Sequence, residues 1–125
     1  MRLLGPIFIT GAPAPFATEE REKKWKETVA GGIKNAWPER SYVAEPCEIL
    51  LTFFLAREKL DDTDLDNLLK PCIDAIGSVI FAPASRGRRS RWNRDDHWVR
   101  RIVAEKLLAT RELGVEVTVN SLRPL

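Results

Sequence analysis

An apolar run at residues 49–55, Ile-Leu-Leu-Thr-Phe-Phe-Leu, is the feature that most restricts how this chain can fold. A run that is short, almost continuous and rich in aromatic residues is typical of a strand buried in a core. The chain has 125 residues, which suit one ordinary domain and are too few for two large ones. We therefore expect a single domain over residues 1–125 that includes this strand.

Composition limits both the location and the chemistry of the protein. No apolar run approaches the roughly 20 residues of a membrane-spanning helix, so we expect a soluble, unsecreted, cytoplasmic protein with no membrane partner. The two cysteines, Cys47 and Cys72, and the single histidine, His97, are too few for a disulfide scaffold or a Cys/His zinc site. Any nucleophile, base or metal ligand must come from the 18 acidic residues, from Lys and Arg, or from hydroxyl groups.

The elements around the apolar run follow from spacing and from the positions of prolines. Residues 3–10 predict a strand, and the prolines within residues 11–15 predict a loop. A helix that ends before Pro38 is predicted by four residues on one face: Trp25, Val29, Ile33 and Trp37. A second helix begins near Asp66 and carries an apolar stripe that Gly77 can terminate. That stripe consists of Leu68, Leu69, Cys72, Ile73 and Ile76.

The C-terminal segment has two interpretations. Apolar residues at 98–107 have helical spacing, which slightly favours a helix over residues 98–108. The many β-branched residues and the alternating valines at 115–119 instead favour a β-hairpin with its turn near Arg111.

Two short segments carry opposite charge, although the formal net charge is only +2. Residues 61–66 contain four aspartates and no base, which suits a cation. Residues 86–94 contain five arginines and no acid, which suits a polyanion such as nucleic acid. The predicted nucleic-acid contacts are Arg86, Arg88, Arg89, Arg91, Arg94 and Trp92. The alternatives are a solvated loop and a tryptophan that packs in the core.

The acidic segment offers a catalytic arrangement. Asp64 and Asp66 lie on the same side only if the backbone between them is extended. If a helix begins at Asp66, Lys70 lies one turn later on the same face, and its ammonium can reach the carboxylate pair. Clustered carboxylates suit Mg²⁺ or Mn²⁺, and Asp95 or Asp96 can complete the metal site. Such a metal would polarise a phosphodiester and generate hydroxide, while Lys70 offsets developing charge.

Simpler roles are open for the same residues. Residues 61–66 can be an acidic loop in which Asp66 only caps the following helix. Asp74 lies four residues after Lys70, a spacing that favours a surface ion pair between the two side chains.

The order Asp-x-Asp-Asn-x-x-Lys-Pro-x-x-Asp-Ala resembles the RusA family of Holliday-junction resolvases. The matching residues are Asp64, Asp66, Asn67, Lys70, Pro71, Asp74 and Ala75. Downstream, the Asp95-Asp96 pair followed by Val99 matches a second landmark of the family, and the first loop carries the expected prolines. The chain differs from the family at Trp98, where Gln is usual, and in the longer interval filled by residues 85–94.

The resemblance implies an α+β fold with one mixed sheet, two main helices and the order β-α-β-α-β-β. It makes residues 97–109 a strand, against the helical spacing. It implies a homodimeric, Mg²⁺-dependent endonuclease that makes paired symmetric nicks in four-way DNA junctions during recombination and repair. The residues carried over are Asp64, Asp66, Lys70 and Asp96 as catalytic, with Asp95 joining the three aspartates as a metal ligand. The alternatives are a non-catalytic protein that binds branched DNA, or a nuclease that cuts flaps or forks.

Overall fold

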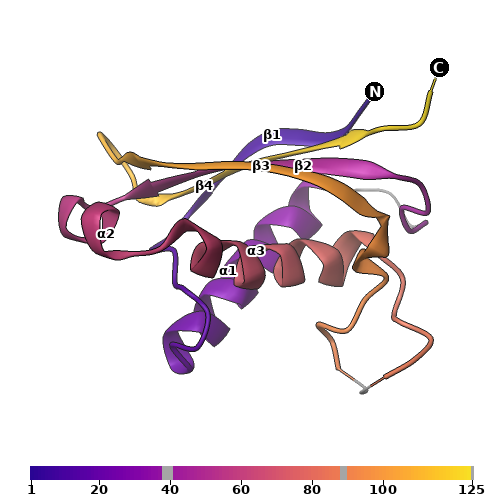
Figure 1. The fold of residues 1–125 in the computed structure, drawn as a ribbon, viewed down its shortest axis with the longest axis horizontal. Coiled ribbons are helices and arrows are strands. Elements are labelled where there is room, and N and C mark those ends of the chain that lie inside the picture. Colours follow the sequence, from indigo (N-terminus) through magenta and orange to yellow (C-terminus); the bar gives the residue numbers. More distant parts are fainter. Residues whose placement is uncertain (38–40, 88–89, 125) are drawn as a thin grey trace.

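The computed structural model describes residues 1–37, 41–87 and 90–124. Its strands are β1 (Arg2–Thr10), β2 (Cys47–Leu55), β3 (Val99–Leu108) and β4 (Gly114–Ser121). Its helices are α1 (Glu20–Ala36), the short α2 (Arg57–Asp62), α3 (Leu65–Ile80) and a 3₁₀ turn, η1 (Asp96–Trp98). Figure 1 shows α1 and α3 on one face of the sheet. The predicted α+β class, with one mixed sheet and two main helices, is confirmed.

The four strands are arranged in the order β1-β4-β2-β3. The β2–β3 pair is parallel, whereas β4 is antiparallel to both β1 and β2. The strand predicted over residues 97–109 is confirmed for Val99–Leu108, whereas residues 97 and 98 belong to η1, and the helical spacing of this segment is misleading. The predicted hairpin is wrong, because β4 lies between β1 and β2 and does not pair with β3. The local pattern marks both strands, but partner choice depends on contacts far away in the sequence.

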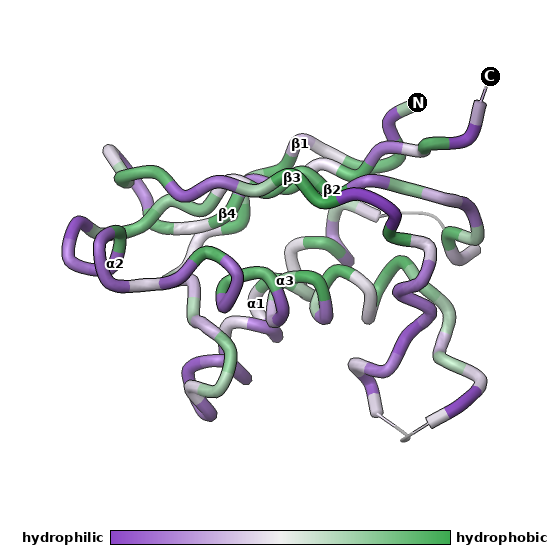
Figure 2. Tube along the Cα trace, in the orientation of Figure 1, coloured by the Kyte–Doolittle hydropathy of each residue, from purple (hydrophilic) through white to green (hydrophobic). Residues whose placement is uncertain are grey.

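Strand β2 places every second side chain in the core. Residues facing the helices are fully buried, including Ile49, Leu51 and Phe53, while the alternate residues are half-buried. Helix α1 covers them with Trp25, Val29 and Ile33, as its four-residue spacing predicts. Figure 2 shows the hydrophobic residues of the strands and of α3 facing one another across this layer.

Helix α3 continues beyond the residue expected to end it. Gly77 lies inside the helix, which ends at Ile80, so the predicted termination at Gly77 is wrong. Pro71 also lies inside α3 and has no N–H to donate to the carbonyl of Asn67 one turn earlier. The backbone N–H of Phe16 donates to that carbonyl instead, at 2.8 Å. The proline therefore leaves an acceptor that ties the first loop to the start of α3.

The short helix α2 has no signal in the sequence because none of its residues is buried. It is held from the sheet by Lys106 of β3, whose ammonium donates to the carbonyl oxygens of Leu60 and Thr63, each at 2.7 Å. This contact fixes the backbone immediately before Asp64. Within the part of the chain that the structure describes, every helix is too short or too polar to cross a membrane.

Candidate active site along α3

The acid pair begins α3. Asp64 occupies the N-cap position with extended backbone (φ −71°, ψ 133°), and Asp66 lies in the first turn. The alternative in which Asp66 caps the helix is wrong, and Asp64 makes no side-chain capping hydrogen bond. Both residues are exposed, and no hydrogen bond or ion pair to another described residue occupies either carboxylate. Two carboxylates are thus presented to solvent with no side-chain partner among the described residues.

Lys70 turns toward the middle of α3. Its ammonium donates to both carboxylate oxygens of Asp74, at 2.8 and 3.1 Å, and not to the acid pair. The predicted ion pair is confirmed, but it is only partly at the surface. The Asp74 side chain is 8% exposed, whereas that of Lys70 is 60% exposed. The structure thus places Lys70 between the acid pair and a buried carboxylate.

Lys26 of α1 also belongs to this site, and the sequence analysis missed it. Its Nζ lies 3.7 Å from Oδ2 of Asp74 and 4.3 Å from the centre of the Trp92 ring. The Lys26 side chain is only 12% exposed. No motif marks this lysine, because its importance depends on how α1 packs against α3.

A small β-ribbon positions Asp95 and Asp96 beside the end of α3. The Asp95 N–H donates to the carbonyl of Ala82 at 2.9 Å, and the Ala84 N–H donates to that of Asn93 at 3.0 Å. Asp96 then packs so closely against α3 that a Cβ on Gly77 would lie 2.8 Å from its Oδ1. Glycine is therefore needed at 77 for close approach rather than for helix termination.

The environment of Asp96 disfavours its charged form. Burial raises its pKa to about 6, and the nearby carboxylates of Asp74 and Asp95 act in the same direction. Lys70 and His97 lower the pKa without offsetting this rise. Its Oδ1 is buried and has no hydrogen-bond partner among the described residues. The burial of the Asp96 carboxylate is therefore only partly compensated by nearby positive charge.

The acidic residues lie at different levels of α3. Gly77, beside Asp96, is about 16 Å further along the helix axis than Asp66. Among the described residues, no three His, Cys, Asp or Glu side chains form a group that could hold a metal ion. The four aspartates predicted as one metal cluster, including Asp64 and Asp95, are thus not gathered into one. Mg²⁺ still suits these donors, because it commonly takes one or two carboxylates and completes its shell with water and phosphate.

The arginine-rich loop contains both exposed and structural side chains. Arg86 and Arg91 are exposed. Arg94 instead donates from Nε to the carbonyl of Arg91 at 2.8 Å and from Nη1 to that of Phe81 at 3.4 Å. The ring of Trp92 is contacted by Lys26 and by the Arg91 guanidinium, 4.5 Å from its centre. The predicted DNA contacts Arg88 and Arg89 lie outside the described residues.

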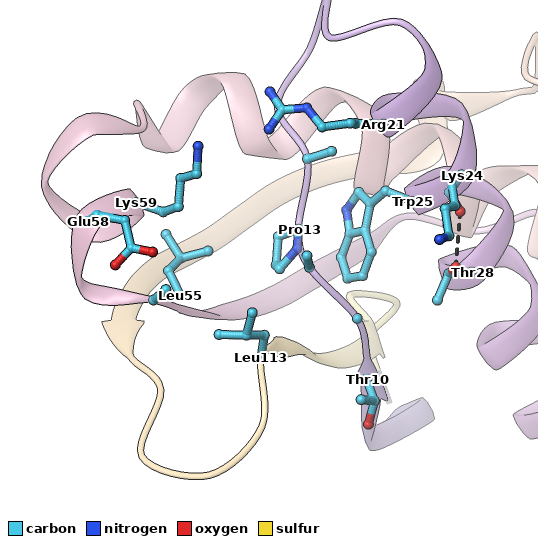
Figure 3. A pocket seen from close by; sticks show the side chains of 14 residues that line it. Thr10, Pro13, Arg21, Lys24, Trp25, Thr28, Leu55, Glu58, Lys59 and Leu113 are labelled. Carbon is cyan, nitrogen blue, oxygen red and sulfur yellow. Dashed lines mark hydrogen bonds between the residues drawn. The ribbon is translucent and has the colours of Figure 1, made fainter.

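A cavity of about 480 Å³ lies between the first loop, α1 and the start of α2. Its lining includes Pro13, Trp25 and Leu55, with three basic side chains around them: Arg21, Lys24 and Lys59. Figure 3 shows Arg21 and Lys59 approaching from different elements, with Pro13 of the loop between Leu55 and Trp25. Glu58 also lines the cavity, so basic and acidic side chains meet here, next to the start of α3.

The raised pKa of Asp96 predicts a measurable effect on stability. Since protonation is favoured in the folded state, this contribution is present below about pH 4 and is lost as pH rises through about 6. Asp96→Asn should therefore stabilise the metal-free protein by about 1–2 kcal/mol at about pH 8, a value discounted for partial solvent screening. At about pH 4 the two proteins should be equally stable. Urea unfolding at both pH values measures the difference in the free energy of unfolding between the variant and wild type. A difference of the same size at both pH values would contradict the prediction.

Together, these features are typical of a nuclease. A pure DNA-binding protein gains nothing from exposed acids that repel phosphate, whereas a nuclease uses carboxylates, a lysine and an arginine-rich loop together. Comparison with protein families agrees with this class. The chain belongs to the endodeoxyribonuclease RusA family, whose model matches residues 10–120.

Family membership implies Holliday-junction resolvase activity, and branched DNA is the substrate on which the family acts. A search of curated proteins found no match to the chain. The match to the family model covers α1, the acid pair, Lys70, the arginine-rich loop and the Asp95-Asp96 pair.

Proposed function

We propose that the protein is a Mg²⁺-dependent endonuclease that resolves four-way DNA junctions by paired symmetric nicks. The observation that carries this proposal is the pair of exposed carboxylates, Asp64 and Asp66, at the start of the helix that carries Lys70 in a RusA-family chain. No contact among the described residues explains the two acids structurally. Their placement suits a site that meets its ligands from solvent.

The proposed role of each residue follows from where it lies. Asp64 and Asp66 would hold the cation from the start of α3. Asp95 and Asp96 lie toward the other end of this helix, so the ribbon and the start of α3 would have to come closer together on binding for their carboxylates to join the same cation. Bound Mg²⁺, or Mn²⁺, would supply charge stabilisation at the phosphodiester and a more acidic water. Lys70 would donate from its ammonium to the phosphate as negative charge develops there.

DNA binding rests on the basic groups at the two ends of α3. The exposed Arg86 and Arg91 lie near its C-terminal end. Arg21, Lys24 and Lys59 line the cavity beside its start. Lysines and arginines placed this way contact phosphates and position duplex arms without reading sequence.

A homodimer would explain paired nicks, because a two-fold protein presents two equal sites to a roughly two-fold junction. The edge strand β3 supports association of this kind. It exposes three apolar side chains, Ile102, Val103 and Leu107, among charged residues, and a second copy would cover them. Sedimentation equilibrium tests this directly, and a monomer at the concentration of the cleavage assay would contradict it.

Metal titration on a synthetic four-way junction tests the proposed reaction. We expect no cleavage in EDTA and nicks that rise with Mg²⁺ concentration. Tight junction binding with no product at any Mg²⁺ or Mn²⁺ concentration would instead make the protein an accessory factor for branched DNA. Faster cutting of flaps or forks than of the junction would identify a different nuclease substrate.

Charge reversal in the arginine-rich loop should weaken binding. Each lost phosphate contact lowers the slope of log affinity against log salt by about 0.9. We therefore expect Arg86→Glu to bind junctions about tenfold more weakly at low salt and with a flatter slope. The matched control is Arg2→Glu, which reverses an exposed arginine at the start of β1. An unchanged slope for Arg86→Glu would remove this residue from the DNA interface.

A further inference from the structure

We propose that Lys26 is a positioning residue that compensates the buried charge of Asp74 when Lys70 leaves it for the substrate. This inference rests on the proposed function, because it concerns how Lys70 is released to act on DNA. It assigns a role to a lysine on α1, outside the motif that carries the acid pair.

Asp74 is held between two lysines of unequal freedom. Lys70 makes both hydrogen bonds to its carboxylate, and its side chain is largely exposed. Lys26 stands slightly further away, at 3.7 Å, and its side chain is almost entirely enclosed. Among the described residues, these two are the cations paired with Asp74.

The two lysines also differ in what else holds them. Lys26 lies over the face of Trp92, where cation–π attraction favours its present position. The ammonium of Lys70 has Asp74 as its hydrogen-bond partner in the described structure. Lys70 is thus the lysine that can move outward, and Lys26 is the lysine that stays.

Moving Lys70 alone would leave a buried carboxylate without a counter-ion, which is strongly unfavourable. Lys26 lowers this cost, because its ammonium can remain as the counter-ion of the Asp74 carboxylate while Lys70 turns to the phosphate. Lys26 also contacts Trp92 of the arginine-rich loop. The loop that meets DNA is therefore connected physically to the residue that permits Lys70 to leave.

Kinetics of Lys26 variants test the proposal. Lys26→Met keeps the aliphatic stem, but Asp74 then attracts Lys70 alone. We expect kcat on saturating junction to fall about tenfold, while Kd for the junction changes less than about twofold. Lys26→Arg should retain most of kcat. Lys23→Met, at an exposed position of the same helix, is the matched control and should match wild type.

A second variant separates this role from a general loss of folding. Asp74→Asn removes the charge that needs compensation, so adding Lys26→Met to Asp74→Asn should lower kcat much less than adding it to wild type. All rates are divided by the folded fraction measured by circular dichroism. Equal loss of kcat in the two backgrounds would overturn the proposal, as would a tenfold loss confined to Kd.

A readout without DNA or metal keeps this test independent of the nuclease assignment. Trace acetylation followed by mass spectrometry measures how readily the Lys70 amine escapes Asp74. We expect labelling of Lys70 to slow about threefold in Lys26→Met and to accelerate in Asp74→Asn, with Lys26→Arg like wild type. Unchanged labelling in Lys26→Met would overturn the role of Lys26. If the variants show these shifts but the wild-type protein cuts no DNA, only the proposed function is refuted.

Discussion

Replacing Asp66 with Asn should lower junction cleavage by about 10³-fold or more, because it removes one of two exposed carboxylates available to the catalytic metal. Junction binding should persist or strengthen, since one acid that repels phosphate is gone. The fold should lose only about 0.3–1 kcal/mol, the usual value of a negative charge in the first turn of a helix. The expected signature is thus a tightly binding, folded and inactive protein.

A nearby acid provides the control for this experiment. Asp62 is exposed at the end of α2, close in sequence to the acid pair and outside the proposed site. Asp62→Asn should cut junctions at the wild-type rate when both proteins are assayed under single-turnover conditions. Equal cleavage by Asp66→Asn and wild type would remove the acid pair from the active site.

Gly77→Ala should lower cleavage by about 10–100-fold without unfolding the protein. The added Cβ would lie 2.8 Å from Oδ1 of Asp96 and 3.2 Å from Cδ2 of Phe81. Phe81 is fully buried, so the carboxylate of Asp96 must move instead. Displacing a catalytic group by a fraction of an ångström to about 1 Å has effects of this size.

Gly31→Ala is the matched control, because its added Cβ meets nothing within 4 Å on α1. It should retain full activity and stabilise the protein by about 0.5–1 kcal/mol, as alanine does in a helix. Urea unfolding and single-turnover cleavage of both variants separate the two effects. Full activity in Gly77→Ala would show that the contact with Asp96 is unimportant for the reaction.

Much of the fold is predictable because buried faces leave periodic patterns. The spacing of Trp25, Val29 and Ile33 indicates α1, and the apolar run around Ile49 indicates β2. The insertion of β4 between β1 and β2 leaves no such pattern in the sequence. The alternation of buried and exposed residues along a strand is the same whichever strand it pairs with. Helix α2 is not predictable for another reason: none of its residues is fully buried, and a single partly buried leucine, Leu60, gives no periodic pattern.

Some residues of the candidate site can likewise be predicted from the sequence, and others cannot. Asp64, Asp66 and Lys70 are predictable because neighbouring residues on one helix carry the motif. The ion pair of Asp74 with Lys70 is likewise predictable from their spacing. The burial of Asp74 and the contacts of Lys26 and Asp96 depend on how α1, α3 and the ribbon pack, so they need the three-dimensional structure. Gly77 is the clearest case, because a helix-ending glycine and a glycine required for close packing look identical in a sequence.

Cleavage of a four-way junction, compared with a linear duplex of the same arm sequences, tests the central claim most directly. Each strand is labelled in turn, the protein is added with Mg²⁺, and the products are separated on a denaturing gel. The proposed function predicts nicks at symmetric positions in two opposite strands of the junction and none in the duplex. Equal cutting of the duplex, or tight junction binding with no nicks, would contradict it.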